Sequence, residues 1–321
     1  APQGRILGTG NIEVADRREE VVGELQAQGG VDLINKDRVG VIWGSGIGGL
    51  VTFQEECVAF GKGDGTPRFN PFFIPKMIAD IASGHISINY GFRGPNYTTT
   101  SACASSNNAM IDAFNYIRLG KSDIIVTGGS EAAVCETGVG GFNACKALSE
   151  NNDNYATASR PFDATRDGFV LGEGAGCLIL EEYEHAKARG AKIYCEVMGG
   201  GLSADAYHIT APHPDGLGAK NVMFAALDDA GMRPEDIDYI NTHGTSTPVG
   251  DTKELEAIRE VFGANGLNQQ PAIASTKSLS GHALGAAGVN EAIYTLLMMR
   301  HNFIAASANI ETMDPAAEGL N

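Results

Sequence analysis

Basic residues are scarce in this chain, and their scarcity narrows the choice of partners. Lysine and arginine together number 23 in 321 residues, against 39 aspartates and glutamates, so the formal net charge is −16 and the pI about 4.8. Such an acidic protein is repelled by nucleic acids and by anionic membranes. The sequence therefore predicts no general nucleic-acid role, and an acidic partner would need a local basic patch.

Long apolar runs and paired cysteine motifs are also missing. The apolar stretch at 292–299 is far shorter than the ~20 residues that cross a bilayer, and the first five residues do not resemble a signal peptide. The six cysteines show no C-x-x-C pair and no Cys/His spacing typical of zinc. We therefore expect reduced thiols, a cytoplasmic location, no membrane contact and no metal or cofactor.

Glycine, in contrast, is abundant: 42 residues, about one in eight, where ~7% is usual. Strand-like runs alternate with helical stretches, one of which ends at Gly231 and another of which follows Gly288. The runs lie at 39–43, 124–127, 176–180, 193–197, 238–241 and 272–275. This alternation predicts an α/β fold, and no Pro- or Ser-rich linker divides the chain.

Cys103 is the best candidate for a reactive group. It lies in Thr-Ser-Ala-Cys-Ala-Ser, where a β-branched run changes into small residues and then into the helical pattern 109–118. A thiol on such a strand-to-helix turn lies beside free backbone N–H groups and the positive end of the helix dipole, which favour a nucleophilic thiolate. The other five cysteines have no distinguishing context, and we expect them to be structural or surface residues.

The stretch Gly44–Gly49 fits the pattern G-x-G-x-x-G and follows a predicted strand. A dinucleotide site would also need an acidic residue at the end of a second strand ~20 residues later, and here that region is the glycine-rich loop 61–65. We therefore interpret the motif as a tight turn beneath a substrate channel.

Two histidines follow predicted strands in the second half of the chain. His243 lies in Thr-His-Gly-Thr-Ser-Thr-Pro, and His282 in Ser-Gly-His-Ala-Leu-Gly-Ala-Ala-Gly. A thiolate and two imidazoles suit covalent acyl catalysis, in which the imidazoles stabilise a developing oxyanion. A Cys-His-Asn protease and a metal site are weaker interpretations, because the protease uses one histidine as its base and no convincing carboxylate pair accompanies these two.

These motifs resemble the elongating β-ketoacyl-acyl carrier protein synthases, most closely synthase II of dissociated bacterial fatty-acid synthesis. The resemblance runs from about Asn35 to Asn321. Further matching stretches are 71–75, 90–95, 138–142, 159–163, 166–176 and 205–210.

The resemblance implies a thiolase-like fold with five layers, α-β-α-β-α, made of two similar halves at 1–178 and 179–321, and a homodimer. It also implies a decarboxylative Claisen condensation. An acyl group is loaded from acyl carrier protein onto Cys103, and malonyl-carrier protein then loses carbon dioxide to give an enolate, which His243 and His282 stabilise.

Supporting roles follow from the motif positions. The resemblance implies that Lys277 and Glu291 organise the histidines and local water. It implies a substrate-binding set made of Thr245, Thr247, Thr210, Ile47 and Phe142, of which the first two contact the pantetheine arm and the last two border the acyl pocket. It also places Arg68 and Lys146 where the acidic carrier protein docks.

Two stretches differ from the family pattern. Residues 11–34 do not match it, and its Gly-Phe-Gly-Gly-Thr-Asn loop, which gates the acyl site and supplies an oxyanion donor, would come after Asn321; we expect that loop to lie beyond the sequence given. A type II polyketide ketosynthase is the alternative enzyme. A non-catalytic chain-length-factor-like partner is another, although such proteins replace the nucleophilic cysteine that is present here.

Overall fold

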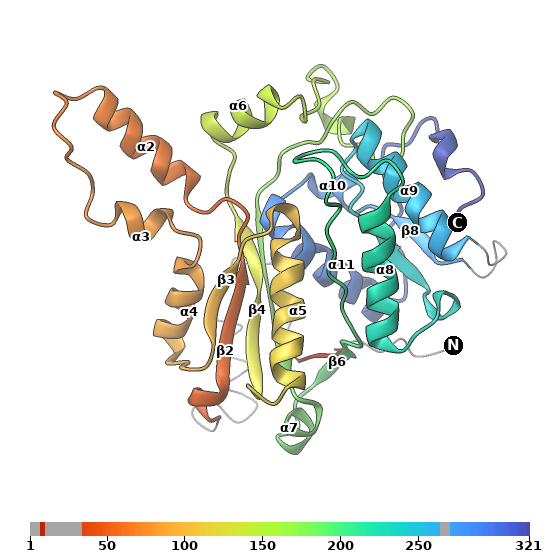
Figure 1. Ribbon diagram of the computed structural model, residues 1–321, viewed down its shortest axis with the longest axis horizontal. Helices are drawn as coiled ribbons and strands as arrows, with labels where there is room; N and C mark the ends of the chain where they lie inside the picture. Colours follow the sequence, from red (N-terminus) through yellow and green to blue (C-terminus); the bar gives the residue numbers. More distant parts are fainter. Residues whose placement is uncertain (1–6, 10–33, 264–269) are drawn as a thin grey trace. The chain divides into compact units, whose positions relative to one another are not determined.

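Figure 1 shows the computed structural model of the chain, which describes residues 7–9, 34–263 and 270–321. Most of segment 11–34 lies outside this part. The chain forms two compact units that alternate along the sequence. Unit 1 contains the described residues up to Gly141, Gly172–Val197 and Ala283–Leu297, and unit 2 contains Phe142–Leu171, Met198–His282 and Met298–Asn321. The predicted sequence halves, 1–178 and 179–321, stay a prediction.

All six predicted strands are present. Unit 1 holds β1 Leu7–Thr9, β2 Val39–Gly44, β3 Asn96–Thr99, β4 Ile124–Glu131, β5 Gly174–Glu181 and β6 Ile193–Glu196. Its helices include α2 Leu50–Gly61, α3 Phe73–Met77, α4 Ile81–Tyr90, α5 Ser105–Arg118 and α7 Tyr183–Ala188. Unit 2 holds β7 Tyr239–Asn241, β8 Ala272–Ala274, α8 Leu217–Ala230, α9 Pro248–Phe262 and α10 Lys277–Ser280. Two helices, α6 Glu136–Ala144 and α11 Ala287–His301, pass from unit 1 into unit 2.

The main sheet of unit 1 has the strand order β3-β2-β4-β5. Strand β2 pairs in parallel with β3 and with β4, whereas β5 is antiparallel to β4. Every residue of β2 is buried, because both faces of the sheet are covered. This burial accounts for the continuous apolar run at 39–43.

Alternate residues of the strands feed two separate cores. Val41 and Val126 pack in a cluster with Ile86 and Tyr90 of α4, whereas Ile42 packs with Ala109 and Ala113 of α5 and with other apolar residues of the sheet. Since side chains alternate across a strand, the two helices cover opposite faces. Figure 1 shows α5 running along β4, with the turn that carries Cys103 at its first residues.

The same bend occurs twice in unit 1. Ala102 and Leu284 both have a φ of 49°, each begins a short 3-10 turn, and the turns lead into α5 and α11. The two turns contact each other. A non-glycine residue at positive φ is uncommon and is held only where its surroundings determine it.

In unit 2, the parallel strands β7 and β8 pack against α8 and α9. Leu227 of α8 and Ile258 and Phe262 of α9 form the core, with Ile240 and Ile273 of the strands against it. Helix α8 ends, as predicted, at Gly231, whose φ of 63° suits a residue without a side chain.

A buried arginine joins three segments of unit 2. Arg166 lies 3.2 Å from Asp251 and 2.5 Å from Asp314, and its guanidinium donates to the carbonyls of Thr247 and Pro248. The guanidinium and the Asp251 carboxylate are almost wholly enclosed, so each compensates the charge of the other. The network fixes the loop that follows His243.

In the part of the chain that the structure describes, no helix combines the length and the apolar character needed to cross a membrane.

Candidate active site

Cys103 lies on the strand–turn–helix junction that the sequence predicted. It is the middle residue of the 3-10 turn Ala102–Ala104, which leads directly into α5, and its side chain is partly exposed. Two hydroxyls hold the turn through three hydrogen bonds: the Oγ of Ser105 accepts from the N–H of Ser101 and donates to the Ala102 carbonyl, and Thr99 donates to the Ser105 carbonyl. The small polar residues around Cys103 therefore build the bend and leave the thiol accessible.

His243 follows β7 directly, and a carboxylate holds its turn. The N–H groups of His243 and Gly244 donate to the two carboxylate oxygens of Glu254 on α9, at 2.7 and 2.8 Å. Gly244 has a positive φ, and a Cβ there would lie 2.6 Å from Cβ of Ser275, so only glycine fits. The Gly after His243 is thus required by the close approach of two turns.

His282 is almost completely buried, at 2% exposed. Its backbone N–H donates to the Val170 carbonyl at 2.8 Å, and His282 forms an isolated parallel β-bridge with Leu171. Phe169 packs edge-on against the imidazole, with ring centroids 5.2 Å apart. Backbone pairing and ring packing together fix the direction of this side chain.

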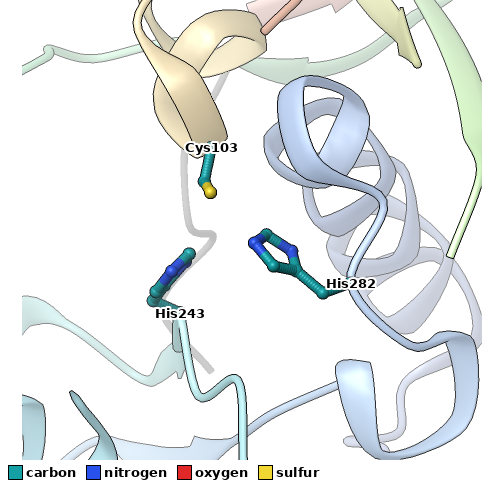
Figure 2. A group of neighbouring side chains, drawn as sticks. All are labelled: Cys103, His243 and His282. Atoms are coloured by element: carbon teal, nitrogen blue, oxygen red, sulfur yellow. The ribbon is translucent and has the colours of Figure 1, made fainter. Parts of the chain in front are cut away.

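The two imidazoles are neighbours within unit 2. Their ring centroids are 5.2 Å apart, their planes are perpendicular, and they have ring nitrogens within 4.8 Å of each other. Figure 2 shows them with Cys103, which stands at the turn before α5. The two histidines lie 39 positions apart in sequence (282 − 243), so the fold brings them together.

Both histidines are uncharged at neutral pH. Burial lowers the pKa of His243 to about 3, and the ammonium of Lys277 acts in the same direction. Burial likewise lowers the pKa of His282 to about 2, helped by His243 and Lys277. His282 is the more enclosed of the two, since it is buried whereas His243 is an exposed residue, so burial acts most strongly on the pKa of His282. A neutral imidazole offers one N–H donor and one acceptor nitrogen.

The structure also places the supporting residues. Lys277, predicted to organise the histidines, is 2% exposed and opens α10, whereas Glu291 lies in α11, in the part that belongs to unit 1. In unit 2 the hydroxyls of Thr245 and Thr247 lie 3.0 Å apart, and Thr210 is exposed in the loop before α8. The two threonines therefore present a pair of adjacent hydroxyls.

The predicted acyl-pocket residues lie in different units. Ile47, in unit 1, is 40% exposed. Phe142, in unit 2, packs edge-on against Phe169, with centroids 5.4 Å apart, and Phe169 in turn contacts His282. A continuous aromatic contact thus joins Phe142 to His282.

The predicted docking cations are both exposed. Arg68 lies 3.9 Å from Asp64, and Lys146 lies 3.8 Å from Glu150. Such surface pairs are weak, so both cations stay available to a partner.

Two residues of this region, Glu254 and Phe169, are not evident from the sequence. Desolvation raises the pKa of Glu254, opposed by its hydrogen bonds from Gly244 and His243 and by the charge of Lys277. The residue lies 11 positions after His243 on the next helix, and its acidic character alone does not distinguish it from its neighbours in Lys-Glu-Leu-Glu. Phe169 lies within a matching stretch, but only the packing reveals its contact with His282.

Thiolate and imidazole are also ligands of zinc. Within unit 2, His243 and His282 offer two nitrogen ligands of this kind. That the protein needs no metal or cofactor stays a prediction.

Comparison with known proteins identifies the family. Residues 20–186 match the family description "Beta-ketoacyl synthase, N-terminal domain", and residues 194–311 match "Beta-ketoacyl synthase, C-terminal domain". The chain is 47% identical over 284 residues to 3-oxoacyl-[acyl-carrier-protein] synthase 2 of Staphylococcus aureus. The aligned region covers 88% of this chain and 69% of that protein. The synthase 2 of Synechocystis is 46% identical over 289 residues, covering 90% and 68%.

Solved structures agree with the sequence comparison. A beta-ketoacyl synthase from Burkholderia phymatum superposes with a TM-score of 0.85 at 36% identity, over 94% of this chain and 72% of that one. A type II polyketide ketosynthase, solved in complex with its acyl-carrier protein, gives a TM-score of 0.83 at 34% identity, over 90% and 71%. The predicted thiolase-like fold is thereby confirmed, and the chain belongs to the β-ketoacyl synthase family of condensing acyltransferases.

Proposed function

We propose that this chain elongates acyl groups on acyl carrier protein by decarboxylative Claisen condensation, with Cys103 as nucleophile and with His243 and His282 stabilising the enolate. The observation that carries the proposal is the pair of adjacent, uncharged imidazoles. Uncharged N–H donors suit an oxyanion that forms and disappears within one turnover. Condensation also needs a nucleophile, and Cys103 offers a partly exposed thiol on the turn before a helix.

The first half-reaction is acyl transfer. The thiolate of Cys103 attacks the carbonyl carbon of acyl-carrier protein, the carbon–sulfur bond to pantetheine breaks, and the carrier leaves with its thiol. The acyl group is then held as a thioester on Cys103, bordered by Ile47 and Phe142.

The second half-reaction forms the carbon–carbon bond. Malonyl-carrier protein binds with its pantetheine arm along Thr245 and Thr247, and Thr210 belongs to the same substrate-binding set. The bond to its carboxylate breaks, carbon dioxide leaves, and the electron pair passes into an enolate whose oxygen accepts from the N–H groups of His243 and His282. The enolate carbon attacks the thioester carbonyl, and Cys103 leaves as thiolate. Lys277 and Glu291 organise the histidines and local water.

Mass spectrometry of the intact protein tests this assignment. Incubation with acyl-carrier proteins of graded length should add the mass of one acyl group to the peptide that contains Cys103, and malonyl-carrier protein should then remove it. Acylation on another residue, or no acylation at all, would contradict the proposal. The same series reports which chain length is preferred.

A type II polyketide ketosynthase is the second candidate. The solved ketosynthase that superposes with a TM-score of 0.83 favours it, whereas the relatives at 46–47% identity are synthases of the fatty-acid type. Analysis of the reaction product distinguishes the two candidates. A fatty-acid synthase should release a saturated β-ketoacyl product after one addition, whereas a polyketide ketosynthase should add several ketide units. Cys103 argues against a non-catalytic chain-length-factor-like partner.

The lowered histidine pKa values predict the pH dependence of malonyl decarboxylation. We expect no loss of rate with an apparent pKa near the ordinary value of 6.5, because both imidazoles stay uncharged until the pH approaches their lowered pKa values. The unfolded chain takes up these protons below 6.5, so the two histidines weaken the folded state progressively as the pH falls. The measurement is the single-turnover rate between about pH 5 and pH 8; an inflection near 6.5 that disappears in His282→Gln would contradict it.

Docking of the carrier protein gives a further prediction. We propose that Arg68 and Lys146 bind its acidic surface, which a chain of net charge −16 would otherwise repel. Charge reversal to glutamate at either position should raise KM for the carrier several-fold, about 1 kcal/mol, with little change in kcat. The effect should shrink at high salt. Lys192→Glu, which changes an exposed lysine outside the predicted docking set, should leave KM unchanged.

We also propose that the protein forms a homodimer in the cytoplasm, as the family resemblance implies. Exposed apolar residues on and around α2 and α3, among them Phe53, Phe60 and Phe72, support an interface, because large apolar patches mark binding surfaces.

A further inference from the structure

The glycine motif Gly44–Gly49 encloses a carboxylate of the protein itself. Glu131, the last residue of β4, accepts from the backbone N–H of Gly46 at 2.6 Å and from those of Ile47 and Gly48 at 3.2 Å. The hydroxyl of Ser45 lies 3.3 Å from the same carboxylate. Successive N–H groups that converge in this way form an anion-binding nest, the arrangement with which other glycine loops hold phosphate.

A second segment of unit 1 reaches the same carboxylate. The N–H of Gly285 donates to Glu131 at 3.2 Å, from the 3-10 turn that precedes α11. A Cβ on Gly46 or on Gly285 would lie 2.7 Å from a carboxylate oxygen, so the motif needs glycine to make room for the side chain of Glu131. Glu131 is 4% exposed. A carboxylate of the protein itself therefore occupies the nest, and the motif can be explained without a bound nucleotide.

This carboxylate also lies beside the nucleophile turn. A Cβ on Gly46 would lie 3.1 Å from the carbonyl oxygen of Ala102, the residue before Cys103. Glu131 thus holds a turn that supports Ala102 on one side and carries Ile47 on the other. A buried charge satisfied by several N–H groups is a strong constraint, because removing it leaves those donors unpaired.

We propose that Glu131 is a positioning residue: its carboxylate acts as a built-in anion that sets the Gly44–Gly49 turn, and with it Ile47 and the turn of Cys103. The role in acyl-chain selection rests on the proposed function, whereas the anion site in the nest does not. The inference explains why a glycine motif typical of phosphate binding occurs in an enzyme that handles thioesters.

Removal of the side chain and return of a free carboxylate test the proposal. Glu131→Ala should lower kcat/KM about 100-fold and shift the preferred acyl length, and added formate should restore at least about tenfold. Formate should also raise the melting temperature of Glu131→Ala but not that of the wild type. This thermal shift requires no activity, so it tests the nest even if the wild type proves not to be a condensing enzyme.

Two further variants keep the test decisive. Glu131→Gln preserves volume but turns an NH₂ group toward N–H donors, and it serves if the alanine variant does not fold; it should show the same shift in acyl length. Glu181→Gln is the matched control, since Glu181 is a buried carboxylate at the other end of the β4–β5 pair, bound to Arg189. It should leave the acyl-length profile unchanged. Folded Glu131 variants with wild-type kcat/KM and profile, or no thermal shift with formate, would overturn the proposal.

Discussion

Cys103→Ala should abolish both acyl-enzyme formation and condensation, with a loss of rate on the order of 10⁴-fold or more. The sulfur of Cys103 is the atom that would hold the acyl group covalently. Alanine lacks this atom but is small enough for the 3-10 turn. The expected readouts are no added acyl mass in intact-protein mass spectrometry and no β-ketoacyl product.

The control for this variant is Cys57→Ala, which removes an exposed thiol from α2 and should acylate and condense as the wild type does. Circular dichroism and thermal unfolding should match for all three proteins. Continued elongation by folded Cys103→Ala would exclude the nucleophile assignment.

His282→Ala should separate the two half-reactions. Loss of an N–H donor to the enolate oxygen should slow malonyl decarboxylation by ~10²–10³-fold, the usual effect of removing one oxyanion donor. Acyl transfer to Cys103 should continue, because that step needs the thiolate rather than the enolate stabiliser. Release of carbon dioxide from labelled malonyl-carrier protein measures the first, and intact mass measures the second.

The conservative variant His282→Gln keeps an N–H donor and should retain more decarboxylation than His282→Ala. His301→Ala, at the exposed end of α11, is the matched histidine control and should change neither half-reaction. Unchanged decarboxylation in His282→Ala would show that the enolate role belongs elsewhere, and a matching loss of acylation would indicate a general structural defect instead.

Local patterns in the sequence were enough to predict six of the strands and the turns on which the candidate residues lie. The run at 39–43 is apolar because β2 is buried on both faces, and the small residues around Cys103 are needed for the bend before α5. Likewise, the glycines and hydroxyl residues around His243 and His282 indicate turns in the sequence alone. Such features depend on neighbours along the chain, so the sequence displays them directly.

Residues that act across the fold could not be predicted in this way. Glu254 binds the His243 turn only because α9 lies beside β7, and Glu131 meets Gly285 only because β4 and the turn before α11 come together. Both are ordinary glutamates in the sequence. Each carboxylate holds a turn because the folded chain brings backbone N–H groups close to it. No pattern of spacing in the sequence indicates such a contact.

The repeated bend before α5 and before α11 carries opposite demands on its second position. In one copy that position is Cys103, where a side chain is indispensable to the chemistry we propose; in the other it is Gly285, where a Cβ would lie 2.3 Å from the Gly46 nitrogen. The second copy therefore excludes any side chain at this position, whereas the proposed reaction needs one in the first. The same backbone bend thus constrains its second residue by reactivity in the first copy and by space in the second.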